Sequence, residues 1–269
     1  MEPDDEDLWP PFYLAGNSGR EAREQHVHDQ LSRRRERGAP PPRRARSLSR
    51  REIVRAAVTV ADAEGRDAIS MRRIARELGA GAMSLYWHVS SKEELLDLMV
   101  DAVQGENQPP DPSGDWRADL AAIARGQRAA LHRHRWVMDF MGGRPPMGPN
   151  SLRNAEHGLA ALDSLGLDSE VTINVLMTVA TYVMGAVVRE LQEERAEHDW
   201  TRGLDGLTPD EADKRISEYT GWLRRSGRYP RLVEMVDAGI DPDARETRDA
   251  RFEFGLACLL DGVASRLAR

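Results

Sequence analysis

The segment from Ser70 to Val100 constrains the fold of this chain more than any other. Within it, two short apolar stripes at helical spacing lie on either side of Gly79 and Gly81. The stripes consist of Ile74, Ala75 and Leu78 before the glycines and Met83, Leu85 and Val89 after them. Glycine adopts backbone angles that other residues avoid, so this pair suits the tight connection of a helix-turn-helix unit. The second helix, from about Ala82 to His88, is too short to be stable alone.

Capping signals place the helices around these glycines. Ser49 with Glu52 and Ser91 with Glu94 both match the capping box, in which two side chains satisfy each other's backbone amides. Ser70 caps the helix between them. The first of these helices has one apolar face, made of Ile53, Val54, Ala57, Val60 and Ala61. The pattern predicts a three-helix helix-turn-helix domain at residues 47–94, a unit that typically binds duplex DNA.

The short helix from about Ala82 to His88, the third of the domain, is expected to enter the major groove as the recognition helix. Ala82, Met83 and Ser84 form its first turn, where contact with base edges is easiest. The first two can touch a thymine methyl group but cannot donate a hydrogen bond. Arg72, exposed at the start of the preceding helix, can reach a guanine edge or a phosphate.

Contacts with the DNA backbone are expected from the residues that follow. Tyr86, Trp87 and His88 suit the sugar–phosphate backbone, which provides affinity rather than specificity. Lys92 starts the next helix, where its ammonium group and the free backbone amides both favour phosphate. Each aromatic residue alone could be a half-buried core residue, and His88 alone could be a surface histidine. Their grouping behind a helix-turn-helix pattern favours contact with DNA.

Charge is distributed unevenly along the chain. The net charge is −7, yet residues 33–51 hold nine arginines, including Arg50 and Arg51, against the single acid Glu36, so this segment carries +8 and the remainder −15. Such asymmetry is expected of a DNA-binding end joined to an acidic body. Residues 1–46 are predicted to be a mostly disordered, Arg-rich arm. Together with Arg50 and Arg51 it adds phosphate or minor-groove contacts, or else it is a solvated arm without a role.

Beyond a Pro-rich break at 108–112, residues 95–269 are predicted to form a larger helical domain, so the fold class is all-α. Helices are expected at 116–139, 151–165, 168–197, 209–225 and 247–267, with loops at 203–209 and 226–245. No strand pattern or internal repeat is evident.

Two of these helices are apolar over a wide surface. Val171–Val188 contains no charged residue, and the last helix carries Phe252, Leu256, Leu259, Leu260, Val263 and Leu267. Polar residues such as Asn174 argue against a membrane span. Helices of this kind must be buried on several sides. Two from each of two chains would form a four-helix dimer interface, unless both pack only within the monomer. Cys258, the single cysteine, lies among leucines and is expected to be a buried structural thiol.

The segment Ser84-Leu-Tyr-Trp-His-Val89, with Lys92 after it and Arg72 before it, resembles the DNA-binding domain of the tetracycline-repressor family. Four segments of the larger domain also have counterparts in the tetracycline repressors: Gly142–Pro145, Leu159–Gly166, Tyr182–Gly185 and Phe252–Leu256. The resemblance implies an all-α homodimer that binds a palindromic operator in double-stranded DNA and represses transcription. It also implies that residues 95–269 bind a small molecule, which releases the DNA. The tetracycline repressors carry a polar amide at the position of Ala82, so a different operator sequence is expected here.

The resemblance also bears on the effector. Two histidines and a glutamate support magnesium in the tetracycline repressors, and the matching positions here are Phe140 or Met141, then Thr181 and Arg189. Neither a cofactor nor a metal is therefore expected, and the effector is expected to be apolar or aromatic. The expected ligand-binding residues are Trp136, Phe140, Met141, Asn150, His157, Met177, Thr181, Tyr182 and Met184. For each methionine the alternative is ordinary core packing.

An enzyme is not indicated, because the seven histidines are scattered along the chain. His132 and His134 are two residues apart and so lie on different faces of a helix, unlike a metal-binding pair. No Gly-rich phosphate loop or nucleophile elbow is present, and the acidic start does not resemble a signal peptide. The expected function is that of a ligand-responsive repressor in the bacterial cytoplasm, associated with the nucleoid. The alternative is a DNA-binding activator, or a regulator that responds to a protein partner.

Overall fold

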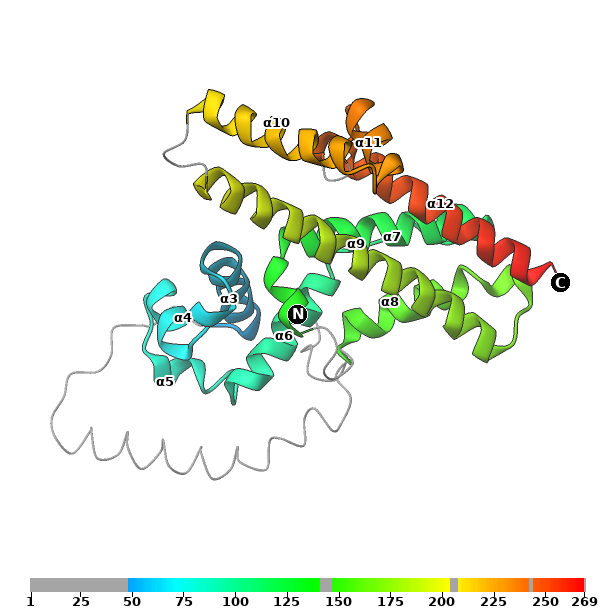
Figure 1. Ribbon diagram of the computed structural model, residues 1–269. Helices are drawn as coiled ribbons and strands as arrows, with labels where there is room; N and C mark the ends of the chain where they lie inside the picture. The colour runs from blue at the N-terminus through cyan, green and yellow to red at the C-terminus, as the bar shows by residue number, and fades with distance from the viewer. Residues whose placement is uncertain (1–47, 141–146, 204–207, 242–243, 269) are drawn as a thin grey trace, which may run out of the picture. The chain divides into compact units, whose positions relative to one another are not determined.

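The computed structural model describes residues 48–140, 147–203, 208–241 and 244–268, and throughout these ranges the regular structure is helical (Figure 1). The all-α fold class is therefore confirmed. The chain divides into two compact units, residues 1–176 and 177–269. The predicted Arg-rich arm, the Gly142–Pro145 segment and Met141 lie outside the described residues.

Among the described residues of the first unit, four helices come first, in the predicted helix-turn-helix region. These are α3 (Arg50–Glu64), α4 (Met71–Glu77), α5 (Ala82–Leu85) and α6 (Lys92–Gln104), with a 3-10 turn at Arg66–Ala68. Helix α3 packs against both α4 and α6. Ile53, Ile74, Leu85 and Leu95 are fully buried between them. Burial of one such side chain contributes about 1.5–3 kcal/mol.

The predicted caps are present, with one difference. Ser49 and Glu52 form a complete capping box, and the Ser70 hydroxyl accepts a hydrogen bond from the Arg73 amide. The Ser91 hydroxyl accepts from the Glu94 amide at 3.0 Å. The Glu94 carboxylate, however, accepts from the backbone amide of Ser90, at 2.6 Å, rather than from Ser91. The second capping box is therefore shifted by one residue.

The connection between α4 and α5 depends on Gly79. This residue has φ +61°, in the left-handed region, whereas Gly81 has an ordinary extended conformation with φ −80°. The Gly79 amide donates to the Arg76 carbonyl and the Ala80 amide to the Ala75 carbonyl, the two bonds of a Schellman motif. Of the two glycines in the predicted turn, only Gly79 is required by the backbone.

The remainder of the first unit contains α7 (Trp116–Arg133), a 3-10 segment at Arg135–Phe140, α8 (Pro149–Ala160), a 3-10 turn at Asp163–Leu165 and the start of α9 (Ser169–Gly203). The helix expected over 116–139 stops at Arg133, because His134 has φ −116° and ψ 62°. The helix expected over 151–165 also ends early, at Ala160.

The N-terminus of α8 is capped by a side chain from α6. Gly148 precedes α8 and supplies no side-chain cap. The Asp101 carboxylate, only 3% exposed, instead accepts from the backbone amide and side chain of both Asn150 and Ser151, at 2.9–3.3 Å. A Cβ at Gly148 would lie 2.3 Å from the Asp101 carboxyl group. Glycine is thus required there to let the carboxylate approach.

The second unit consists of the rest of α9, then α10 (Pro209–Ser226), α11 (Pro230–Asp237), a 3-10 turn at Arg245–Thr247 and α12 (Arg248–Leu267). Helix α11 lies inside the predicted loop 226–245, so that prediction was wrong. Helices α9 and α12 pack together: the Tyr182 hydroxyl donates to the Phe252 carbonyl at 2.7 Å, and the buried Glu193 pairs with Arg248 at 3.1 Å.

Several apolar side chains of this helix pair are exposed among the described residues, and together they are called its apolar face. The exposed apolar side chains include Met177 and Val188 on α9 and Phe254 on α12, which is 73% exposed. Cys258 is also exposed, so the expectation of a buried thiol was wrong for the single chain. Within the described residues, Ser169–Arg195 is long and apolar enough to cross a membrane, with a mean hydropathy of 1.9. Length and composition alone are a weak indication of a membrane span.

Candidate DNA-binding surface

Helix α5, the expected recognition helix, is a single turn whose apolar residues anchor it. Leu85 and Val89 are buried, as predicted, at 0% and 1% exposure. Helix α5 ends at Leu85, three residues earlier than predicted, and the chain continues through a turn in which the Val89 amide donates to the Leu85 carbonyl. Met83, assigned from the sequence to the apolar stripe, is 51% exposed. Its side chain is thus available to a partner rather than part of the core.

The residues expected to contact DNA lie mainly on the surface. Ser84 is exposed beside Met83, and Tyr86 and Trp87 are 42% and 47% exposed, too much for ordinary core aromatics. Ala82 and His88 are half-buried. The single turn of α5 and the turn after it therefore present small, hydroxyl and aromatic groups together.

Arg50, expected to contact phosphate, is bonded within the domain. Its Nε donates to the His88 carbonyl at 3.0 Å, and its Nη2 lies 3.3 Å from the Glu94 carboxylate. The first turn of α3 therefore fixes the end of Ala82–His88, which is called the recognition segment below because it is expected to contact DNA. The sequence alone did not suggest this contact, because the two residues are 38 positions apart.

Arg73 fastens α4 to α3. Its guanidinium donates to Glu64, at the end of α3, and to Glu77, one turn further along α4, at 3.1 Å and 2.9 Å. The hydrogen bond from Arg73 is the main reason that the pKa of Glu64 is lowered from its ordinary value of 4.5. The bonds to Glu64 and then Glu77 raise the pKa of Arg73. This arginine is structural, and its neighbour Arg72 is exposed.

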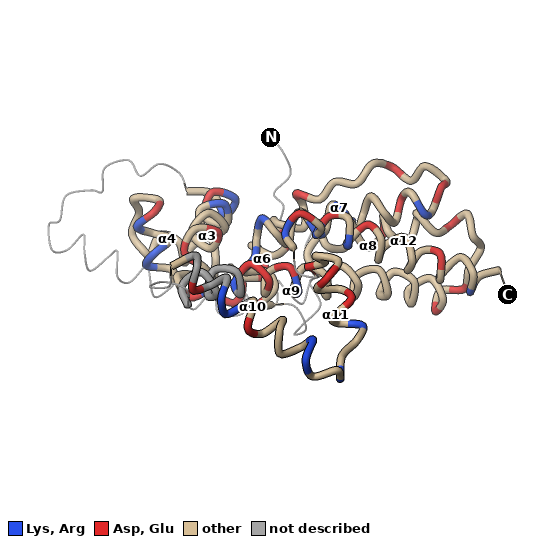
Figure 2. The backbone as a smooth tube through the Cα atoms, turned by 45° about the horizontal axis from the view of Figure 1, so that its top comes forward, with Lys and Arg blue, Asp and Glu red and all other residues tan. Residues whose placement is uncertain are grey.

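Other basic side chains of this region are exposed. Arg51 on α3, Arg72 on α4 and Lys92 at the start of α6 all lie on the surface, as predicted. Arg76 on α4 is exposed as well and was not singled out from the sequence. Figure 2 shows basic residues on α3 and α4. Exposed cations beside an exposed short helix suit duplex DNA, in which the cations contact phosphates and the helix contacts base edges.

In the first unit, the residues expected to bind a ligand make contacts of other kinds. Trp136 is buried and its Nε1 donates to Asp62 at 2.7 Å, and Phe140 packs edge-to-face against it. The Asn150 side chain bonds Asp101, as described above. His157 Nε2 lies 2.7 Å from the Pro110 carbonyl.

The candidates in the second unit all lie on α9. Met177 and Thr181 are exposed, and the Thr181 hydroxyl donates to the Met177 carbonyl one turn earlier. Tyr182 and Met184 are half-buried, and Tyr182 contacts α12. Over the part of the chain that the structure describes, no three His, Cys, Asp or Glu side chains are grouped to hold a metal ion.

These features define a DNA-binding protein of the helix-turn-helix class. They are the turn closed by a Schellman motif, the one-turn helix α5 with its buried anchor, and the exposed arginines beside it. Residues 53–99 match the family described as bacterial regulatory proteins, tetR family, and residues 108–267 match the tetracyclin repressor-like C-terminal domain. The chain belongs to the tetracycline-repressor family of transcriptional regulators.

Similar proteins span most of the chain. The HTH-type transcriptional repressor DrrR1 of Streptomyces coeruleorubidus is 36% identical over 88% of this chain and 83% of its own. The class A tetracycline repressor of transposon 1721, from Escherichia coli, is 31% identical over 80% and 89%. The TetR-family protein ActR of Streptomyces coelicolor, solved with actinorhodin, superposes with a TM-score of 0.63 at 30% identity, covering 81% of this chain and 96% of its own.

Proposed function

We propose that this protein is a dimeric transcriptional repressor that binds a palindromic operator through α5 and releases it when a small molecule binds. The main observation behind this proposal is the exposure of four side chains around a one-turn helix that the buried Leu85 anchors. They are Met83, Ser84, Tyr86 and Trp87. A helix this short is held by its anchor rather than by its own hydrogen bonds. Its exposed residues are therefore free to serve recognition.

The roles follow from position on this surface. Ala82, Met83 and Ser84, in the first turn, read base edges, with Arg72 reaching a guanine or a phosphate. Tyr86, Trp87 and His88, with Lys92 and Arg51, contact the sugar–phosphate backbone. Arg50 acts indirectly, by holding the His88 carbonyl. The DNA-binding domain runs over residues 47–94, and residues 1–46 add backbone contacts.

A dimer is supported by the uncovered apolar face of α9 and α12. Met177, Val188 and Phe254 would be costly to leave in water. Two copies of this helix pair form a four-helix bundle around a two-fold axis, which buries the face. Such a dimer presents two recognition helices to two half-sites, which is why the operator is palindromic.

The effector is a small molecule with substantial apolar surface that binds within residues 95–269. The solved complex of ActR with actinorhodin supports a small-molecule effector for this chain too. The candidates that contact it are Trp136, Phe140, Met141, Asn150, His157, Met177, Thr181, Tyr182 and Met184. Phe140 or Met141, with Thr181 and Arg189, stands where the tetracycline repressors have metal-binding side chains, so the effector binds without magnesium. The protein acts in the cytoplasm, at the nucleoid, and carries no catalytic activity.

Fluorescence anisotropy with DNA from upstream of its own gene tests the DNA-binding surface. We expect tight binding that weakens steeply as salt rises, because released counterions drive the association. Tyr86→Ala should weaken binding to all sequences by a similar factor, about fivefold for one lost hydrogen bond. Ser84→Ala should instead change the preference among operator variants.

The matched control is Tyr219→Ala on α10. Tyr219 is also an exposed tyrosine, at 62%, but it lies outside the proposed surface, so its removal should leave affinity unchanged. If Tyr86→Ala and Tyr219→Ala bind the operator equally well, the recognition helix has been placed wrongly.

A further inference from the structure

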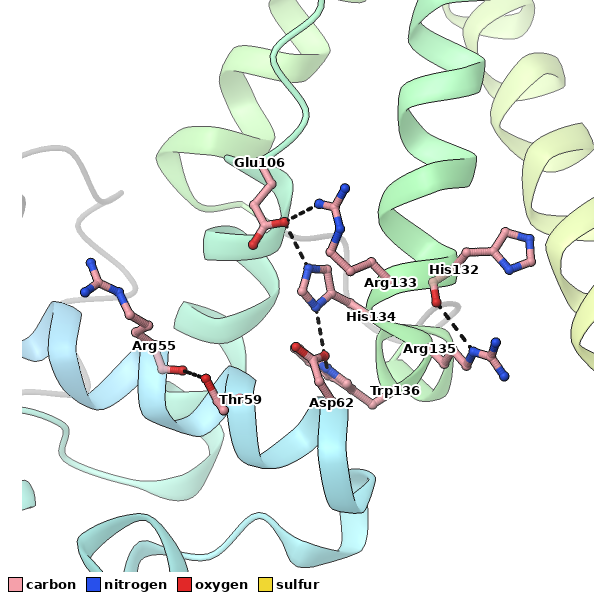
Figure 3. Close-up of polar contacts among 9 residues, drawn as sticks. All are labelled: Arg55, Thr59, Asp62, Glu106, His132, Arg133, His134, Arg135 and Trp136. Atoms are coloured by element: carbon pink, nitrogen blue, oxygen red, sulfur yellow. Dashed lines mark hydrogen bonds and ion pairs between the residues drawn. The ribbon is translucent and has the colours of Figure 1, made fainter. Parts of the chain in front are cut away.

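A buried histidine joins three elements of the first unit. His134, which follows α7, is 3% exposed and has a carboxylate at each ring nitrogen (Figure 3). Its Nδ1 lies 2.8 Å from Asp62 Oδ1 in the last turn of α3. Its Nε2 lies 3.0 Å from Glu106 Oε2, just beyond the end of α6. One imidazole thus bridges α3, the end of α6 and the end of α7.

The partners of the two carboxylates show that both are acceptors. Trp136 Nε1 can only donate, and it donates to the same Asp62 oxygen at 2.7 Å. Arg133 Nη1 donates to the same Glu106 oxygen at 2.6 Å (Figure 3). Burial alone would raise the pKa of Glu106, but the hydrogen bonds from His134 and Arg133 outweigh it and lower the pKa. Glu106 is therefore ionised at neutral pH.

A neutral imidazole cannot satisfy both contacts. It carries a hydrogen on one nitrogen and a lone pair on the other, and that lone pair would face a carboxylate oxygen at hydrogen-bond distance. Imidazolium carries a hydrogen on each nitrogen, so the contacts to Asp62 and Glu106 are complete only when His134 is charged. The charged groups that the structure places at this bridge are Asp62 from α3, Glu106 after α6 and Arg133 from α7.

Helix α3 connects this bridge to the recognition segment. Asp62 lies in its last turn, and Arg50 lies in its first turn, where it holds the carbonyl of His88. The two residues are 12 positions apart, about 18 Å along a helix. A change in how Asp62 is held therefore changes how the residues after α5 are held, through one rigid element.

We propose that His134 is a pH-sensitive latch: as imidazolium it fastens α3 to the ends of α6 and α7, and so fixes the recognition segment for operator binding. The latch is closed while both ring nitrogens carry a hydrogen, and it loses one hydrogen bond when rising pH removes one of the two protons. The loosened α3 must then be ordered on the operator, which weakens binding. This inference rests on the proposed function for its effect on DNA, but not for the protonation of His134.

The first test measures the ring itself. Nitrogen chemical shifts of the histidines in the full-length protein, followed from pH 5.5 to 8.5, should show His134 doubly protonated at the acidic end. In Asp62→Asn the ring should turn neutral at lower pH, because a buried charge has lost one of its two counter-charges. A neutral His134 at pH 5.5, or no difference between the two proteins, overturns the latch whatever the DNA does.

The second test measures the effect on binding. The affinity for DNA from upstream of its own gene should fall about fivefold between pH 6 and 8.5 in the wild type, at the lower end of typical coupling between sites. His134→Gln, which cannot be charged, should show a flat profile, apart from any pH dependence that both proteins share. His132→Gln, in the last turn of α7, should retain the wild-type profile. Equal pH profiles for wild type and His134→Gln refute the latch.

A third measurement separates this result from two other failures. Thermal unfolding followed by circular dichroism identifies a variant that does not fold, in which case Asp62→Asn takes the place of His134→Gln. If wild type fails to bind this DNA at every pH while His134 is doubly protonated, the proposed repressor function or its operator is at fault. The bridge itself would then stand, but its assignment as a latch for DNA binding would be rejected.

Discussion

Asp101→Ala should destabilise the protein more than the loss of any other single contact between α6 and α8. The carboxylate is 3% exposed and accepts four hydrogen bonds from Asn150 and Ser151, two of them from backbone amides in the first turn of α8. Loss of an N-terminal cap costs about 0.5–2 kcal/mol, and buried donors left without an acceptor cost about 1–3 kcal/mol. Since these effects overlap, we expect a total of about 3 kcal/mol.

The Asn variant separates the charge from the contact. In Asp101→Asn one oxygen still accepts, but the amide group now faces donors, so about half of the loss should remain. Glu156→Ala, at an exposed position of α8, is the control and should change stability by less than about 0.5 kcal/mol.

Two measurements check this reasoning. Thermal melts at one fixed protein concentration should place Asp101→Ala about 6–12 °C below wild type, with Asp101→Asn between them. Amide exchange at Asn150 and Ser151 should accelerate in both variants, because these amides lose their acceptor. If Asp101→Ala melts with Glu156→Ala, or the two amides stay protected, the carboxylate does not hold α8.

Three further results are expected. Because the pKa of Glu64 is lowered, its pair with Arg73 stabilises the fold above about pH 4.5, and this contribution is lost as the pH falls below that value. Glu64→Gln should therefore show a smaller drop in urea midpoint than wild type between pH 5 and 3. Arg50→Lys keeps the charge but not both bonds, so operator affinity should fall about fivefold with the salt slope unchanged; full affinity would make Arg50 a simple phosphate contact. Phe254→Glu should yield monomers in sedimentation velocity, whereas Tyr219→Glu should not, and a dimeric Phe254→Glu would place the interface elsewhere.

Local patterns in the sequence predicted the helix-turn-helix region well because its signals are local. Ser49, Ser70 and Gly79 act on residues within one or two turns, and the buried Leu85 and Val89 follow from helical spacing. Helix α11 was missed for the opposite reason. Its eight residues lie between Gly, Pro and Asp signals typical of a loop, and none of them is buried in the single chain.

Contacts between distant residues could not be predicted from one sequence. His134 and Asp62 are 72 positions apart, and Asp101 and Ser151 are 50 apart, so no spacing rule relates them. The exposure of Cys258 could not be predicted either, since α12 is apolar around most of its circumference and the sequence does not say which side faces its own chain. The same limit applies to the ligand-binding residues, whose roles stay predictions.

The uncovered face of α9 and α12 has a consequence for how stability responds to dilution. If Met177, Val188 and Phe254 are buried only when two chains meet, the folded dimer is favoured by mass action, and its melting temperature rises with protein concentration. A newly made chain at low copy number would then spend longer with this face in water, exposed to aggregation and proteolysis. The amount of functional regulator would therefore grow more steeply than the number of chains synthesised.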